Sequence, residues 1–129
     1  MHIDLSNKTA VVTGGSSGIG LASVELFLEA GANVAICGRD PAKLDKVKNR
    51  LVGVHDEKRI LSCSCDVLNK DEVEVFASEV EEKFGGVDML INNAGQARVS
   101  TFSSTTEEDW REELELKFFS IIHCSKAFL

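Results

Sequence analysis

Short apolar runs alternate with amphipathic stretches along the chain, which predicts strands that alternate with helices. The strands are expected at residues 9–13, 33–37, 60–65 and 87–92. Helical spacing of apolar residues predicts helices at residues 18–30, from Pro41 onward, at 70–84 and from Thr105 to the end of the chain. The run at 33–37 lacks polar alternation, so we expect that strand to be buried on both faces. This order favours an α/β fold, a doubly wound parallel sheet with helices on both faces.

Polar residues mark the expected starts of the helices. Asp40 stands before Pro41 as an N-cap. Asn69 with Glu72, and Thr105 with Glu108, have the spacing of capping boxes. The apolar face of the first helix is expected to comprise Ile19, Ala22, Phe27 and Ala30.

The bulk composition fits one globular domain over residues 1–129. Its hydrophobic content is 43%, and its net charge is −7 with a pI near 4.9. An acidic chain is a poor match for nucleic acid or an anionic membrane. The N-terminus has no apolar signal segment, and no apolar run reaches membrane-spanning length. We therefore expect a cytoplasmic protein with neither nucleic acid nor a membrane as partner.

The four cysteines are scattered, and only Cys63 and Cys65 are close in sequence. Both fall on one predicted strand and should point to the same face. A lone Cys-x-Cys pair without a second ligand pair is a poor zinc site. We expect reduced thiols and no metal site.

The segment at residues 13–20, TGGSSGIG, follows the first predicted strand and opens the first predicted helix. Gly14 permits a tight turn out of the strand, Gly18 removes a side chain at the helix start, and Gly20 allows close helix–sheet packing. A dinucleotide pyrophosphate binds at such a strand-to-helix turn. The alternative is a glycine-rich turn without a ligand.

The glycine spacing G-x-x-x-G-x-G, together with Asn92-Asn93-Ala94-Gly95 after the fourth strand, resembles the short-chain dehydrogenase/reductase family. The resemblance covers the whole chain but about half of a usual member, its N-terminal cofactor-binding half. It implies a Rossmann-type fold in which Asp66-Val67 contacts the adenine and Asn92 braces the sheet. The implied cofactor-binding residues are Gly14, Ser16, Ser17, Gly18, Ile19, Gly20, Arg39, Asp66, Val67, Asn93, Ala94 and Gly95.

The end of the second strand bears on the choice between NAD(H) and NADP(H). An acidic residue there would accept hydrogen bonds from the ribose 2′-hydroxyl and repel a 2′-phosphate. This chain has Gly38 there instead, followed by Arg39, whose guanidinium suits a phosphate. We favour NADP(H). The alternative is a solvent-exposed Arg39 in a turn, with Asp40 as the helix cap.

The resemblance breaks at the catalytic residues. The family uses a Ser and a Tyr-x-x-x-Lys element that lie beyond residue 129, and the chain contains no tyrosine. We assign no catalytic residue and expect this chain alone to be inactive. Lys117 stands where the family usually has a proton-relaying Asn, counted from Trp110. It either relays protons or is a surface lysine in a structural contact.

Three functions remain open from the sequence. The first is the N-terminal part of an oxidoreductase that transfers hydride between NADP(H) and a small carbonyl or alcohol substrate, with Gln96, Ala97 and Arg98 as candidates to approach the nicotinamide or substrate. The second is a non-catalytic dinucleotide-binding or redox-sensing module. The third is a truncated product without function. We expect a homo-oligomer in the full-length form.

The expected strand order, third-second-first-fourth, has consequences for the isolated chain. It would leave the fourth strand as an unpaired apolar edge. An apolar helix face around Phe118, Phe119, Ile121 and Ile122 would also lack partners. We expect marginal stability and a tendency to associate.

Overall fold

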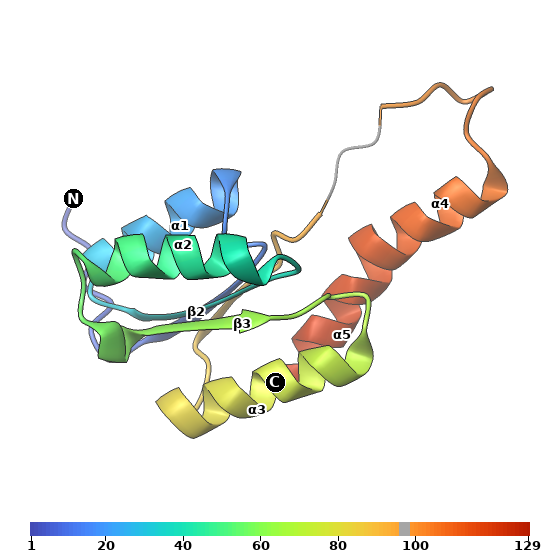
Figure 1. The fold of residues 1–129 in the computed structure, drawn as a ribbon. Helices are drawn as coiled ribbons and strands as arrows, with labels where there is room; N and C mark the ends of the chain where they lie inside the picture. The colour runs from blue at the N-terminus through green and yellow to red at the C-terminus, as the bar shows by residue number, and fades with distance from the viewer. Residues whose placement is uncertain (96–98) are drawn as a thin grey trace.

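A four-stranded parallel sheet forms the centre of the molecule (Figure 1). The computed structural model describes residues 1–95 and 99–129; Gln96, Ala97 and Arg98 lie outside the described residues. The strands are β1 Thr9–Thr13, β2 Asn33–Gly38, β3 Ile60–Ser64 and β4 Met89–Ile91. Their order is β3-β2-β1-β4, and every neighbouring pair is parallel. The predicted α/β class and strand order are confirmed.

The two central strands are buried, and their side chains alternate between two apolar cores. In β1, Val11 lies beside Ala35 of β2 and Leu90 of β4 in the ladder. Val11 belongs to the core cluster beneath α3, whereas Val12 belongs to the cluster beneath α1 and α2. A strand that faces a core on both sides has no polar alternation, so the absence of that alternation at residues 33–37 correctly predicted burial.

Helices cover both faces of this sheet. Their bounds are α1 Gly18–Glu29, α2 Pro41–Val52, α3 Lys70–Phe84, α4 Glu107–Leu114 and α5 Ser120–Ala127, with a 3-10 turn η1 at Glu57–Arg59 and a π-helical turn η2 at Glu115–Phe119. In Figure 1, α1 and α2 lie on one face and α3 on the other, while α4 points away from the sheet. The α5 end packs beside α3 through an edge-to-face contact of Phe128 with Phe76, whose ring centroids are 5.4 Å apart.

Two of the three predicted helix caps are confirmed. The Asp40 carboxylate accepts hydrogen bonds from the backbone N–H groups of Ala42 and Lys43. Asn69 likewise caps α3, because its side-chain oxygen accepts the backbone N–H groups of Asp71 and Glu72. Of the predicted capping box with Glu72, the structure therefore has the half that Asn69 makes.

The third cap prediction was wrong by one residue. The capping box of α4 is formed by Thr106 and Asp109, not by Thr105 and Glu108. The Thr105 hydroxyl instead donates to the Thr101 carbonyl oxygen at 2.6 Å, within the preceding turn. That bond occupies the Thr105 side chain and leaves its neighbour to cap the helix.

The predicted apolar face of α1 was wrong except for Phe27, which is partly buried against the core cluster beneath α1 and α2. The buried residues of that helix are Gly20, Val24 and Leu28, spaced four apart, whereas Ile19 is 80% exposed. The predicted face left out Val24 and Leu28, which follow Gly20 at helical spacing. Gly20 marks the buried face because its lack of a side chain permits close packing.

The C-terminal segment carries an exposed apolar face, as expected. Phe118, Phe119, Ile121 and Ile122 are each between 39% and 54% exposed. Only Ser120 and Cys124 of α5 are buried. None of the helices in the described part of the chain is long and apolar enough to cross a membrane.

Candidate functional site

The turn between β1 and α1 is built by close backbone approach. A Cβ atom on Gly20 would lie 2.3 Å from the Gly14 carbonyl oxygen and 2.4 Å from the Asn93 side-chain nitrogen, so no other residue fits there without displacement. Gly14 has a φ of 66° and Gly18 a φ of 55°, in the left-handed region that glycine adopts readily. The start of α1 is thereby held against the turn that precedes it.

The first turn of α1 has no side-chain cap. Ser17 is the N-cap residue, and its hydroxyl makes no capping hydrogen bond. The first N–H groups of a helix have no partner within the helix and carry its positive dipole end. An uncapped helix start with two serine hydroxyls, Ser16 and Ser17, can donate hydrogen bonds to an anion such as phosphate.

Thr13 ties this turn to the segment that follows β4. Its hydroxyl oxygen accepts hydrogen bonds from the backbone N–H groups of Asn93 and Ala94, both at 3.0 Å. The Asn93 side-chain amide donates to the Gly14 carbonyl oxygen at 3.1 Å. The Asn93 side chain therefore joins the turn after β1 to the segment after β4. The family resemblance implies that this same residue lies along the cofactor. These bonds also explain why β4 ends at Ile91, one residue before the predicted end, since the chain turns toward β1 there.

A cavity of about 980 Å³ opens at the carboxyl ends of the strands. All of the predicted cofactor-binding residues except Gly18 and Gly20 line it: Gly14, Ser16, Ser17, Ile19, Arg39, Asp66, Val67, Asn93, Ala94 and Gly95. Gly20 is buried behind the lining, and Gly18 lies at the exposed start of α1. Ligands of open α/β sheets bind in such a crevice.

Further lining residues were not among the predicted cofactor-binding residues, although the sequence analysis had already placed Gly38 at the end of the second strand. They are Cys37, Gly38, Asp40, Lys43, Cys65 and Leu68 beside the strands, and Glu108, Arg111, Glu112, Glu113, Glu115 and Leu116 from α4 and η2. Lys43 could have been found, because the first turn of the helix after β2 lies next to the end of that strand. The glutamates of α4 and η2 reach the cavity only because of where α4 lies relative to the sheet. No local sequence pattern predicts that position.

Two cysteines form part of the cavity floor. Cys37 and Cys65 line the cavity and belong to the same core cluster as Cys124, with Cys63 partly buried against it. A hydrogen bond with the Cys65 thiol, together with burial, raises the pKa of Cys37. All four thiols are free, and no group of residues in the ranges 1–95 and 99–129 could hold a metal ion.

Cys63 lies on the edge strand, outside the cavity just described. Its thiol donates to the Glu79 carboxylate at 2.6 Å. Burial and this carboxylate raise the pKa of Cys63 to about 12, and burial with the neighbouring Cys65 raises the pKa of Cys124 to about 11. Thiols with raised pKa values are poor nucleophiles and poor metal ligands at neutral pH.

Lys117 is not part of the cavity lining. It lies in the π-helical turn η2, and its ammonium group pairs with Glu113 at 2.5 Å. Glu113 does line the cavity, so the lysine is one residue removed from it.

Comparisons with known proteins agree with this geometry. The sequence profile described as short chain dehydrogenase matches residues 8–129. A short chain oxidoreductase from Pseudomonas aeruginosa, solved with NADPH and described as containing an atypical catalytic center, is 54% identical with a TM-score of 0.94. The match covers 98% of this chain and 49% of that one.

Two further relatives show the same partial coverage. A 3alpha-hydroxysteroid dehydrogenase from Mediterraneibacter gnavus is 32% identical over 98% of this chain and 51% of its own length. The L-sorbose reductase of Gluconobacter frateurii, solved with NADPH and L-sorbose, is 32% identical with a TM-score of 0.91, over 99% of this chain and 48% of that one. The chain thus spans about half the length of the relatives it matches. With the profile match across nearly all of its residues, the chain belongs to the short-chain dehydrogenase family.

Proposed function

We propose that this chain is the NADP(H)-binding part of an oxidoreductase that acts on a small carbonyl or alcohol substrate. The observation that carries the proposal is the uncapped start of α1, which opens onto the cavity beside Arg39. When bound, NADPH would donate hydride to a carbonyl carbon, and NADP+ would accept hydride from an alcohol carbon. The described residues bind and orient that cofactor.

Each part of the cavity has a role in this proposal. The α1 start, with Ser16, Ser17, Gly18 and Ile19, receives the pyrophosphate, while Gly14 and Gly20 shape the turn. Arg39 receives the 2′-phosphate, since no carboxylate occupies the position at Gly38. Asp66 and Val67 contact the adenine, and Asn93, Ala94 and Gly95 lie along the ribose and pyrophosphate.

The relatives support a nicotinamide cofactor. Both solved structures reported above contain NADPH, and the first is 54% identical to this chain over the matched half of its length. Arg39 is the feature of this chain itself that favours the phosphorylated form. We infer a small-molecule substrate and a homo-oligomer for the full-length form, by the same family relationship.

A second function follows from one observation, the absence of tyrosine from the 129 residues. The family's general acid is a tyrosine, so we expect this chain by itself to bind NADPH without turnover. A non-catalytic dinucleotide-binding or redox-sensing module would behave in the same way. Reading the coding sequence past the codon for Leu129 separates the two. A Ser and a Tyr-x-x-x-Lys element there favours the oxidoreductase, and a stop codon favours the module.

Calorimetric titration of the 129-residue chain with NADPH and with NADH tests cofactor binding. We expect tighter binding of NADPH. Replacing Arg39 with alanine should weaken NADPH binding about tenfold, the loss of one charge-assisted phosphate contact, and leave NADH binding nearly unchanged. Lys58→Ala, which removes the same charge on η1 away from the cavity, is the matched control. Tighter binding of NADH would overturn the preference, and binding of neither would overturn the dinucleotide site.

A further inference from the structure

Arg39, which follows β2, and Lys43, in the first turn of α2, line the cavity without an ion-pair partner among residues 1–95 and 99–129. Among the described residues, no carboxylate lies within ion-pair distance of Arg39 or Lys43. Arg111, the third cation of the lining, is paired with Glu107 at 2.7 Å. In a chain of net charge −7, two unpaired cations at one end of a cavity mark a place where a ligand can supply the negative charge.

The start of α2 cannot supply that attraction through its backbone. The Asp40 carboxylate already accepts the N–H groups of Ala42 and Lys43, at 3.0 and 3.3 Å, and Pro41 has no N–H. An anion at the end of β2 therefore meets a closed helix start and a nearby carboxylate. Side-chain cations must therefore donate hydrogen bonds to this anion and offset the negative charge of Asp40.

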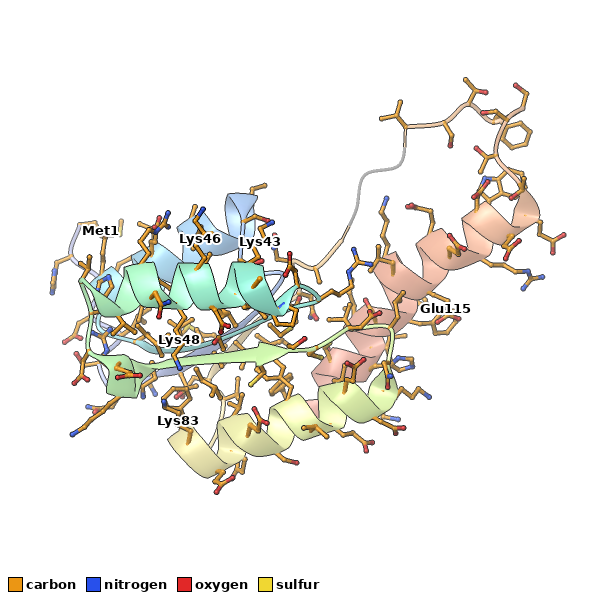
Figure 2. The ribbon with its side chains drawn as sticks, in the orientation of Figure 1. Met1, Lys43, Lys46, Lys48, Lys83 and Glu115 are labelled. Carbon is orange, nitrogen blue, oxygen red and sulfur yellow. The ribbon has the colours of Figure 1, made fainter. Side chains whose placement is uncertain are left out.

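We propose that Lys43 is a second determinant of cofactor choice, which contacts the 2′-phosphate of NADP(H) from the first turn of α2 while Arg39 contacts it from the end of β2. This inference rests on the proposed function, since it assigns a residue to the same cofactor site. Lys43 lies at the end of α2 that borders the cavity, and Lys46 and Lys48 lie farther along the helix (Figure 2). Neither Lys46 nor Lys48 lines the cavity.

The roles of the two cations differ. The guanidinium of Arg39 is planar and can form two parallel hydrogen bonds with phosphate oxygens. The ammonium of Lys43 is a compact charge on a flexible stem. Arg39 therefore orients the phosphate, and Lys43 adds charge that compensates Asp40. A lysine-to-arginine change at 43 should preserve binding, because that position requires charge rather than a fixed geometry.

Two small probes isolate the 2′-phosphate in the 129-residue chain. Adenosine 2′,5′-bisphosphate and adenosine 5′-monophosphate differ only in that group, and neither requires the nicotinamide side of the cavity. We expect Lys43→Ala to weaken binding of the bisphosphate about fivefold, the effect of one partly exposed charge contact, and to leave the monophosphate unchanged. Lys43→Arg should bind as the unchanged chain does. Lys46→Ala, one turn along the same exposed helix face, is the matched control.

The outcomes separate this inference from the function on which it rests. If Arg39→Ala weakens bisphosphate binding while Lys43→Ala behaves like Lys46→Ala, Lys43 has no part in specificity and the proposed function stands. If the unchanged chain binds both probes equally, both the NADP(H) preference and the role of Lys43 are overturned. Far-ultraviolet circular dichroism of each variant establishes that a loss of affinity is not a loss of fold.

Discussion

The starts of α1 and α2 occupy equivalent places in the fold, but only the start of α2 has a side-chain cap. Each helix follows a central parallel strand, and each start borders the same cavity. At α2, proline removes one N–H group and the Asp40 carboxylate binds two others. At α1, Ser17 caps nothing, and the first turn is left open. The chain's own carboxylate closes the start of α2, whereas the start of α1 keeps N–H groups that can bind an external anion.

The difference arises from residues rather than from topology. An Asp N-cap followed by proline closes the start of a helix, and such an N-cap stabilises the helix by about 1 kcal/mol. A Gly-Ser-Ser-Gly segment gives up that stability for close backbone approach and free donors. Of the three helices that follow β1, β2 and β3, α1 alone begins without a side-chain cap, and the candidate site lies at its start.

The close approach behind α1 can be broken with one side chain. Gly20→Val would place its Cβ 2.3 Å from the Gly14 carbonyl oxygen, on the buried side of the turn. We expect the free energy of unfolding to fall by about 3 kcal/mol, as for severe overpacking, with loss of NADPH binding. Urea denaturation and calorimetric titration measure the two effects.

Gly18→Ala provides the comparison for that substitution. Nothing lies within 4 Å of a Cβ at this position, and only its positive φ opposes the change. The expected cost is about 1 kcal/mol, from the left-handed backbone alone. Equal destabilisation by the two substitutions would contradict the packing role given to Gly20.

A carboxylate at the N-cap would close the start of α1 in the way that Asp40 closes the start of α2. Ser17→Asp places a carboxylate at the N-cap position, where it can accept the open N–H groups. We expect the free energy of unfolding to rise by about 0.5–1 kcal/mol. Affinity for NADPH should fall by about tenfold or more, because the new carboxylate occupies the donors and repels phosphate.

A gain in stability together with a loss of affinity is the signature of that variant. Thermal unfolding and NADPH titration are measured on the same preparation. Ser103→Asp adds the same charge in the exposed segment before α4 and should change neither quantity. If Ser17→Asp binds NADPH as tightly as the unchanged chain, the pyrophosphate does not bind at the start of α1.

Most of the fold could be predicted because its signals are local. Short apolar runs predicted the strands. Asp40 and Asn69 correctly predicted the starts of two helices. Two adjacent threonines, each followed three residues later by an acid, left the α4 cap ambiguous. A hydrogen bond from Thr105 to the Thr101 carbonyl oxygen decides it. That bond depends on the path of the preceding turn, which the residue pattern does not specify.

The candidate site could be predicted only where its residues lie in local sequence patterns. Glycine spacing and strand ends identified the wall that the β-strands form. The opposite wall, with Glu113 and Glu115, comes from residues far along the chain and was missed. Lys117 illustrates the limit, since its position in the sequence left both a proton relay and a structural contact open. In the structure it lies outside the lining, and its ammonium group pairs with the lining residue Glu113.

Removing the Asp40 cap of α2 is expected to have the smallest effects on stability and on NADPH binding. Asp40→Ala removes the cap and should lower the free energy of unfolding by about 1 kcal/mol. It also removes a negative charge beside Arg39 and Lys43, so we expect NADPH binding to tighten about threefold while NADH binding does not change.

Two control variants separate the effect on stability from the effect on NADPH binding. Asp40→Asn keeps the cap without the charge and should tighten NADPH binding at nearly unchanged stability. Asn69→Ala removes the cap of α3, outside the cavity lining, and should lower stability alone. If Asp40→Asn leaves NADPH binding unchanged, the carboxylate is too far from the phosphate to oppose it, and the closed start of α2 has only a structural role.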